Sequence, residues 1–133
     1  MLVAGLACAV LAHRCLGDSW GLLAAAVTGL LVSPISWSHH WVYCIPVLAL
    51  LWSEARAFLI PALLVFWSHA VWLVPHGGSA ELELTGPEVA RSGWYVVAGL
   101  GFLALTAWRV HAAYDVSDAA REGHDVAVGA ARS

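Results

Sequence analysis

The sequence predicts an all-α protein: a polytopic bundle of about five transmembrane helices followed by a disordered C-terminal tail. Three observations lead to this fold class. First, 61% of the 133 residues are hydrophobic and 11% are charged, whereas about a quarter of the residues of an average soluble domain are charged. Second, the apolar residues form five runs that short polar breaks separate. Third, tryptophans and arginines gather at the ends of these runs, as they do at the two interfaces of a membrane.

The five apolar runs set the number of spans. They are Leu2–Ala12, Trp20–Val32, Trp41–Trp52, Phe58–Val74 and Trp94–Val110. A helix needs about 20 residues to cross the hydrocarbon core, with a lower limit near 17. Phe58–Val74 reaches that limit alone. The other runs reach it by including flanking residues, with Arg14 and Arg56 extending their charged groups to the interface. Five spans are therefore expected, and four result if the first run does not cross.

The chain divides into a transmembrane helical region, residues 1–112, and a tail, residues 113–133. The tail mixes Asp, Glu, Arg, Gly and Ala without an apolar stripe, a composition typical of disordered segments. In the last apolar run, Gly99 and Gly101 are expected to permit close helix packing. The three cysteines lie in or beside apolar runs without a CxxC spacing, which favours packing thiols over a disulfide or a metal site.

The charge distribution predicts which side of the membrane each loop occupies. Arg109, Arg121 and Arg132 mark the tail and its membrane edge, whereas the loop Gly77–Ser92 carries three glutamates against a single arginine. Because an excess of Lys and Arg marks the cytoplasmic side, the tail is expected inside and the acidic loop outside. The mild net charge of −3 gives no indication of nucleic-acid binding.

Alternation of the spans then assigns the remaining loops. Arg14 and Arg56 fall on the cytoplasmic side, and the segment Ser33–His40 falls on the extracytoplasmic side. The tryptophans agree with two interfacial belts: Trp37, Trp41, Trp72 and Trp94 outside, and Trp20, Trp52 and Trp108 inside. In this topology the first run begins outside, which fits the C-terminal part of a longer polytopic protein. The expected location is thus a cell membrane crossed several times.

The segment Ser33-Pro-Ile-Ser-Trp-Ser-His-His-Trp41 stands out because it places polar groups between apolar spans. Such groups are costly at membrane depth unless they face a bundle interior or a wet cavity, so they are candidate functional groups. Pro34 ends the preceding helix, and Ser36 or Ser38 is a good N-cap for the next one. A helix that starts near His39 would present free amide groups, which favour an anion.

This polar segment fits a phosphorylated or glycosidic ligand. The imidazoles of His39 and His40 supply donors for a phosphate or a sugar hydroxyl, and the rings of Trp37 and Trp41 supply flat apolar faces for a sugar. The alternative is a histidine pair that only hydrogen-bonds locally at the interface, since no carboxylate lies nearby in the sequence to orient either ring. A metal site is disfavoured, because adjacent histidines do not easily ligate one ion and zinc needs three or four ligands.

The run Leu30–Val42, with its SPxSWxHH pattern, resembles the C-terminal part of actinobacterial polyprenyl-phosphate-mannose-dependent α-mannosyltransferases (glycosyltransferase family 87, or DUF2029). The resemblance covers the middle of the chain. It implies a GT-C fold with an active site at the outer membrane face. It also implies transfer of mannose from a polyprenyl-phosphate donor to a cell-envelope acceptor, a phosphatidylinositol mannoside or a lipoglycan. No cofactor is implied.

The resemblance also assigns roles to individual residues. It implies that His39 and His40 are catalytic and stabilise the departing phosphate as charge develops. Ser36, Trp37, Ser38 and Trp41 would bind the substrate. The acidic general base of GT-C enzymes lies in their first outer loop, and nothing in this sequence corresponds to it. The chain alone is therefore expected to be an incomplete glycosyltransferase, and the alternative is a small non-catalytic multi-pass membrane protein.

Overall fold

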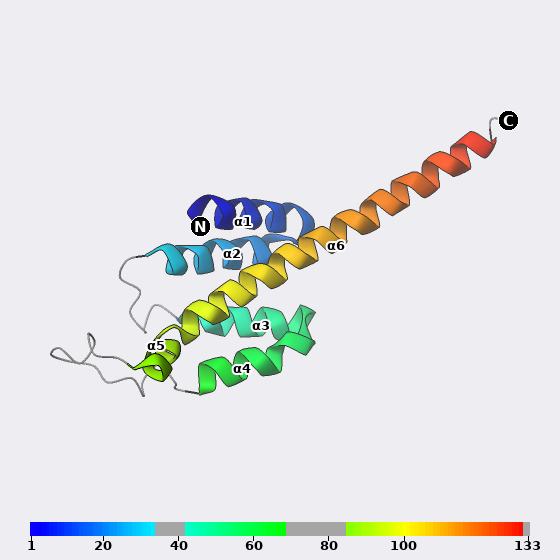
Figure 1. Cartoon of the computed structure of the whole chain (residues 1–133). Helices are drawn as coiled ribbons and strands as arrows, with labels where there is room; N and C mark the ends of the chain where they lie inside the picture. The colour runs from blue at the N-terminus through cyan, green and yellow to red at the C-terminus, as the bar shows by residue number, and fades with distance from the viewer. Residues whose placement is uncertain (34–41, 69–84, 132–133) are drawn as a thin grey trace.

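The protein is represented by a computed structural model that describes residues 1–33, 42–68 and 85–131. Every regular element in these ranges is helical, which confirms the predicted all-α class. The elements are α1 (Leu2–Leu16), α2 (Asp18–Val32), α3 (Cys44–Glu54), a 3₁₀ turn (Arg56–Phe58), α4 (Leu59–Trp67), α5 (Gly86–Ser92) and α6 (Trp94–Ala131). In Figure 1, α1 and α2 lie along one side of α6, α3 and α4 lie along the other, and α6 continues past the bundle.

The number of membrane spans is not confirmed. Among the described helices, α6 over Trp94–Arg121 is long and apolar enough to cross a membrane. The other apolar helices are shorter, and α2 with 15 residues and α3 with 11 residues are about 22 and 16 Å long. Both lengths are below the roughly 30 Å of the hydrocarbon core. Five spans stay a prediction.

Helices α1 and α2 form a hairpin held together by small residues. Gly17 joins them with φ of 100°, a left-handed conformation that glycine adopts without steric cost. A Cβ atom added at Gly21 would lie 2.6 Å from the Cβ of His13, and one added at Gly5 would overlap the side chain of Thr28. The two backbones therefore lie closer together than larger side chains would permit.

The core lies where α2, α3 and α6 meet. Its buried members are Ala12, Trp20, Val27, Val47, Leu50, Leu51, Ala55, Leu59, Phe102, Leu105 and Val110. The fully buried ring of Trp20 stacks on that of Phe102 with 5.8 Å between the centroids. The buried hydroxyls of Thr28 and Thr106 donate to carbonyls one turn earlier in their own helices. Each hydroxyl is thus satisfied without a partner from another helix.

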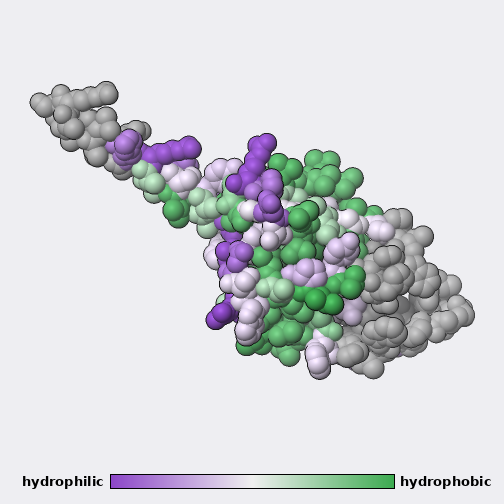
Figure 2. Space-filling view, turned by 180° about the vertical axis from the view of Figure 1, so that it is seen from behind, coloured by the Kyte–Doolittle hydropathy of each residue, from purple (hydrophilic) through white to green (hydrophobic). Residues whose placement is uncertain are grey.

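The outside of the bundle is also apolar. Large hydrophobic side chains are exposed on α1, α2, α3, α4 and α6: Leu6, Val10, Leu22, Ile45, Trp52, Ile60, Leu64, Trp67, Val97, Leu100 and Trp108. Figure 2 shows hydrophobic surface over much of one face of the bundle, with hydrophilic residues toward the extension of α6. Soluble monomers rarely expose so much contiguous apolar surface, so this surface fits contact with lipid or with further helices.

The tail differs from the sequence prediction of disorder. Helix α6 continues through it to Ala131, and residue 112 lies inside this helix. Side-chain pairs one turn apart accompany the extension, with His111 Nδ1 3.7 Å from Asp115 Oδ1 and Arg121 Nη1 3.9 Å from Asp118 Oδ1. An alanine-rich segment that follows a formed helix adds hydrogen bonds without a new nucleus. It therefore needs no apolar stripe of its own to be helical.

Candidate functional site

The predicted site residues lie outside the described part of the chain. These are Ser36, Trp37, Ser38, His39, His40 and Trp41. Their proposed roles therefore stay predictions. The residues on either side are described: Ser33 ends α2 and donates its backbone N–H to the Gly29 carbonyl at 3.0 Å, and Val42 and Tyr43 form a short 3₁₀ turn that leads into α3.

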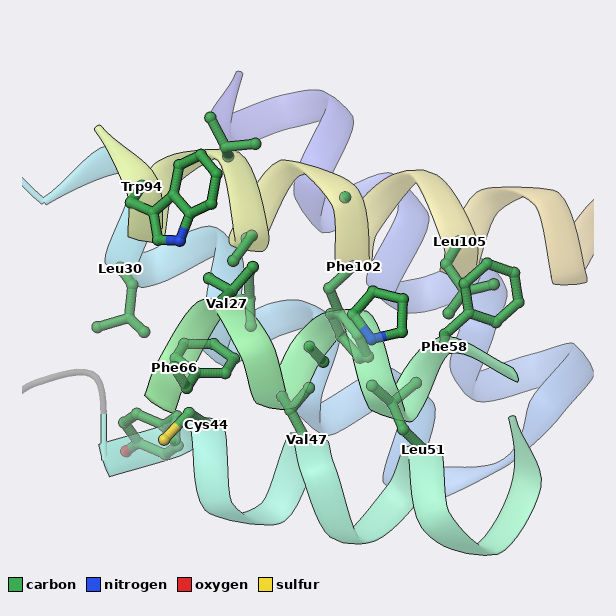
Figure 3. Close-up of a pocket in the computed structure, with 18 residues that line it drawn as sticks. Val27, Leu30, Cys44, Val47, Leu51, Phe58, Phe66, Trp94, Phe102 and Leu105 are labelled. Atoms are coloured by element: carbon green, nitrogen blue, oxygen red, sulfur yellow. The ribbon is translucent and has the colours of Figure 1, made fainter. Parts of the chain in front are cut away.

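A cavity of about 360 Å³ lies beside these flanking residues. Four helices and the turns before α3 and α4 line it: Val27 and Leu30 from α2; Tyr43, Cys44, Val47 and Leu51 at α3; Phe58, Pro61, Ala62, Val65 and Phe66 at α4; and Trp94, Val97, Ala98, Gly99, Gly101, Phe102 and Leu105 from α6. Figure 3 shows these side chains converging from the helices on a common space. Among the lining residues that the structure describes, none has an acidic, basic or amide side chain.

The cavity has two distinguishable ends. Leu30, Cys44 and Trp94 lie toward one end in Figure 3, and Phe58 and Leu105 lie toward the other. We call these the Tyr43 end and the Leu105 end, since Tyr43 directly precedes Cys44. The polar segment predicted to bind phosphate and sugar connects α2 to α3, and the residues that flank it belong to the Tyr43 end.

The chemistry of the cavity is that of a hydrocarbon site. Burial of each methylene group in such surroundings contributes about 0.8 kcal/mol. The polar side-chain atoms of the described lining are the Tyr43 hydroxyl, the Cys44 thiol and the Trp94 indole N–H.

The glycines of α6 differ from their predicted role in one respect. Gly101 lines the cavity, and a Cβ atom added there would meet no atom within 4 Å. Gly101 thus leaves cavity volume empty and does not bring a second helix close. Close approaches to a neighbouring helix are found at Gly5 and Gly21 in the α1–α2 hairpin, and the packing role predicted for Gly99 stays a prediction.

A polar cluster joins three helices beyond the Leu105 end. Trp20 Nε1 donates to Glu54 Oε2 at 2.7 Å, and Arg109 Nη1 donates to the backbone carbonyl of Glu54 at 3.1 Å. The guanidinium carbon of Arg109 lies 4.8 Å from the centroid of the Trp20 ring, a cation–π contact. The cluster therefore links α2, α3 and α6.

Two arginines also cap the end of α3. Arg56 Nε donates to the carbonyl of Trp52 at 3.0 Å, and Arg109 donates to that of Glu54. The last carbonyls of a helix lack partners within it, and positive charge there complements the helix dipole. The sequence marked Trp20, Arg56 and Arg109 as interfacial residues but gave no partner. The sequence could have indicated this cluster, because Glu54 and the two arginines are all predicted near the same membrane face and carry opposite charges.

The arginines predicted on one side of the membrane do gather at one end of the bundle. Arg56 and Arg109 both contact the last turn of α3. On α1, Arg14 and Cys15 lie within interaction range of Tyr114 of α6. This end is opposite to the Tyr43 end. The arrangement fits alternating spans, although which side of a membrane each end faces stays a prediction.

Metal chemistry finds no support in the described ranges. Residues 1–33, 42–68 and 85–131 contain no group of three or more His, Cys, Asp or Glu side chains placed to hold a metal ion.

Comparison with known proteins gives short matches to mannosyltransferases. A polyprenol-phosphate-mannose-dependent α-(1-2)-phosphatidylinositol pentamannoside mannosyltransferase from Mycolicibacterium smegmatis is 45% identical over 47 residues, covering 32% of this chain and 12% of the relative. A polyprenol-phosphate-mannose-dependent α-(1-2)-phosphatidylinositol mannoside mannosyltransferase from the same organism is 59% identical over 29 residues, covering 22% of this chain and 7% of the relative.

A relative from Mycobacterium tuberculosis with the same name as the first is 50% identical over 46 residues, covering 32% of this chain and 11% of the relative. The matches thus span about an eighth or less of the length of these relatives. No protein-family model matches the chain, and no solved structure is similar to it.

Proposed function

We propose that this chain is part of a membrane glycosyltransferase that transfers mannose from a polyprenyl-phosphate donor to a phosphatidylinositol mannoside or a related cell-envelope glycolipid. The names of the relatives supply the donor and acceptor classes. The observation that carries the proposal is the apolar cavity, whose Tyr43 end is lined by residues close in sequence to the polar histidine-bearing segment. A polyprenyl phosphate has the same two parts, a long hydrocarbon and a charged head.

The short sequence distance between His40 and Tyr43 supports a donor whose tail binds in the cavity and whose phosphate binds at the histidines. His40 is three residues before Tyr43, so their Cα atoms lie no more than about 11 Å apart. A hydrocarbon tail in the cavity would then leave its phosphate near the Tyr43 end. His39 and His40 would stabilise the departing phosphate, and Ser36, Trp37, Ser38 and Trp41 would hold the sugar and the phosphate. A positioned donor of this kind lowers the barrier because charge develops on the phosphate in the transition state.

The membrane setting of the proposal is multi-pass, of the GT-C type found in glycosyltransferase family 87, with the Tyr43 end facing the extracytoplasmic side. Two observations support it. Apolar side chains are exposed around the bundle, and arginines on α1, α6 and the turn after α3 gather at the end away from Tyr43. The acidic general base would come from a part of the enzyme that this chain does not contain.

The test is mannosyl transfer by a full-length enzyme that carries this segment. We expect His39→Ala and His40→Ala to lower kcat about 100-fold, the usual effect of removing one donor to a developing anion. His111→Ala is the matched control, because His111 is an exposed histidine on the extension of α6. The assay follows radiolabelled mannose from polyprenyl-phosphate-mannose into phosphatidylinositol mannosides. Unchanged transfer in both histidine variants would rule out the proposed catalytic role of His39 and His40.

A further inference from the structure

We propose that Trp20, Glu54 and Arg109 form a latch that closes the Leu105 end of the cavity and sets how deeply a hydrocarbon chain can enter. The inference rests on the proposed function, since it takes the cavity to hold the tail of a polyprenyl phosphate. It adds a specificity-determining role for three residues that do not touch the reacting groups.

The first part of the latch fixes the cavity wall. Phe102 lines the cavity, and the Trp20 ring stacks on it with an interplanar angle of 2° and 5.8 Å between centroids. Arg109 also lies against the Trp20 ring. Trp20 is fully buried, so its ring cannot turn away without displacing its neighbours. The wall at Phe102 is therefore backed by a rigid aromatic layer.

The second part of the latch fixes the helices that carry the wall. The carboxylate of Glu54 accepts a hydrogen bond from α2, and its backbone carbonyl accepts one from α6. A buried indole N–H needs such an acceptor. Glu54 thus holds the last turn of α3 against two other helices at the same point.

The spacing places the latch directly beyond the end of the cavity. Leu105 lies four residues before Arg109 and Phe102 lies seven before it, so all three share one face of α6. On α3, Leu51 lies three residues before Glu54 and also lines the cavity. The residues that close the Leu105 end therefore lie within one or two helical turns of the latch.

A length series of ligands tests the latch. The whole chain is placed in lipid nanodiscs with Cys8→Ser and Cys15→Ser, which leaves Cys44 in the cavity wall as the single thiol. The rate at which an apolar maleimide labels Cys44 is measured with polyprenyl phosphates of increasing isoprenoid length as competitors. In the protein with an intact latch, we expect the protection of Cys44 from labelling to rise with the length of the polyprenyl tail. It should level off once the tail reaches the wall at Phe102.

Substitutions that break the latch should let the protection of Cys44 continue to rise with longer tails before it levels off. We expect Trp20→Ala and Glu54→Ala each to strengthen protection by the longest tails about tenfold, the effect of burying roughly two further methylene groups. Glu54→Gln keeps an acceptor for the Trp20 N–H and should keep the original plateau. Arg56→Ala is the matched control, because Arg56 caps the same end of α3 through the Trp52 carbonyl and lies over the Trp52 ring. Circular dichroism and gel filtration check that each variant folds. Glu54 is exposed, so Glu54→Ala leaves no cavity in the core.

The outcomes separate the latch from the proposed function. A plateau that stays in place in both Trp20→Ala and Glu54→Ala overturns the latch, as does an equal shift in Arg56→Ala. If no polyprenyl phosphate of any length protects Cys44 when the latch is intact, the proposed donor site is overturned, and the latch with it.

Discussion

Individual residues in this protein have roles that depend on what lies opposite them. Glycines that look alike in the sequence have opposite effects on packing, because Gly5 and Gly21 face side chains or backbone at contact distance and Gly29 and Gly101 face open space. The same holds for the tryptophans. Trp20 is fully buried, whereas Trp67 on α4 is 78% exposed. A residue type therefore does not reveal its contribution until its neighbours are known.

The α1–α2 hairpin should be sensitive to a single methyl group at Gly21. We expect Gly21→Ala to lower the free energy of unfolding by about 1–3 kcal/mol, because the added carbon would overlap His13 and force the helices apart. Denaturant unfolding in detergent, followed by circular dichroism, measures the change. Gly29→Ala on the same helix is the control, since its Cβ would meet nothing within 4 Å. Equal effects of both substitutions would rule out the close-contact explanation.

At the scale of elements, short helices are set by their ends. Helix α5 begins with a capping box in which Glu88 Oε2 accepts hydrogen bonds from Thr85 Oγ1 at 2.6 Å and from Thr85 N at 2.7 Å. Pro87 at the start of the helix has no N–H to satisfy. These features explain why a helix of only seven residues forms here.

The capping box should depend on pH. The hydrogen bonds from Thr85 hold the pKa of the Glu88 carboxyl below its usual value, with a smaller contribution from Arg91. A lowered pKa means that the cap is fully formed above the usual pKa and is lost as pH falls through the lower, folded value. We expect the protection of the Thr85 amide from hydrogen exchange to fall in that acidic range. In Glu88→Gln, which does not titrate, protection should not vary with acidic pH; a matching loss there would contradict this cause.

The extension of α6 should contribute helix without stabilising the bundle. We expect a chain that ends after Val116 to lose helical signal but to keep its unfolding midpoint, because the removed residues up to Arg121 are exposed. Circular dichroism measures both quantities. An unchanged helical signal would instead favour the disordered tail that the composition predicts.

For the whole molecule, the arrangement of the helices relates the cavity to its two ends. The helices run back and forth, so the residues around the histidine-bearing segment gather at one end, and Glu54, Arg56 and Arg109 gather at the other. The cavity lies between them. A membrane that covers the apolar outer surface would separate the two ends by its thickness.

This layout predicts opposite accessibility at the two ends. In a chain without its native cysteines, we expect Ser36→Cys to react with an impermeant maleimide from outside the cell and Arg121→Cys to react only after the cells are opened. The side of labelling is the measurement. Labelling of Ser36→Cys from the inside alone would overturn the proposed topology and the donor site with it.

The sequence by itself determined the helical class, the approximate order of the helices and the positions of charges at their ends. These follow from hydrophobic runs and breaks, which depend on each segment alone. It was less successful in the tail, because composition does not show that a preceding helix can continue, and the histidine-bearing segment that it selected lies outside the described residues. Only the tertiary structure decided the cavity and the latch. A cavity exists where side chains from four helices fail to fill a common volume, and the partners Trp20, Glu54 and Arg109 are 34 and 55 residues apart in the chain, beyond the reach of any local pattern.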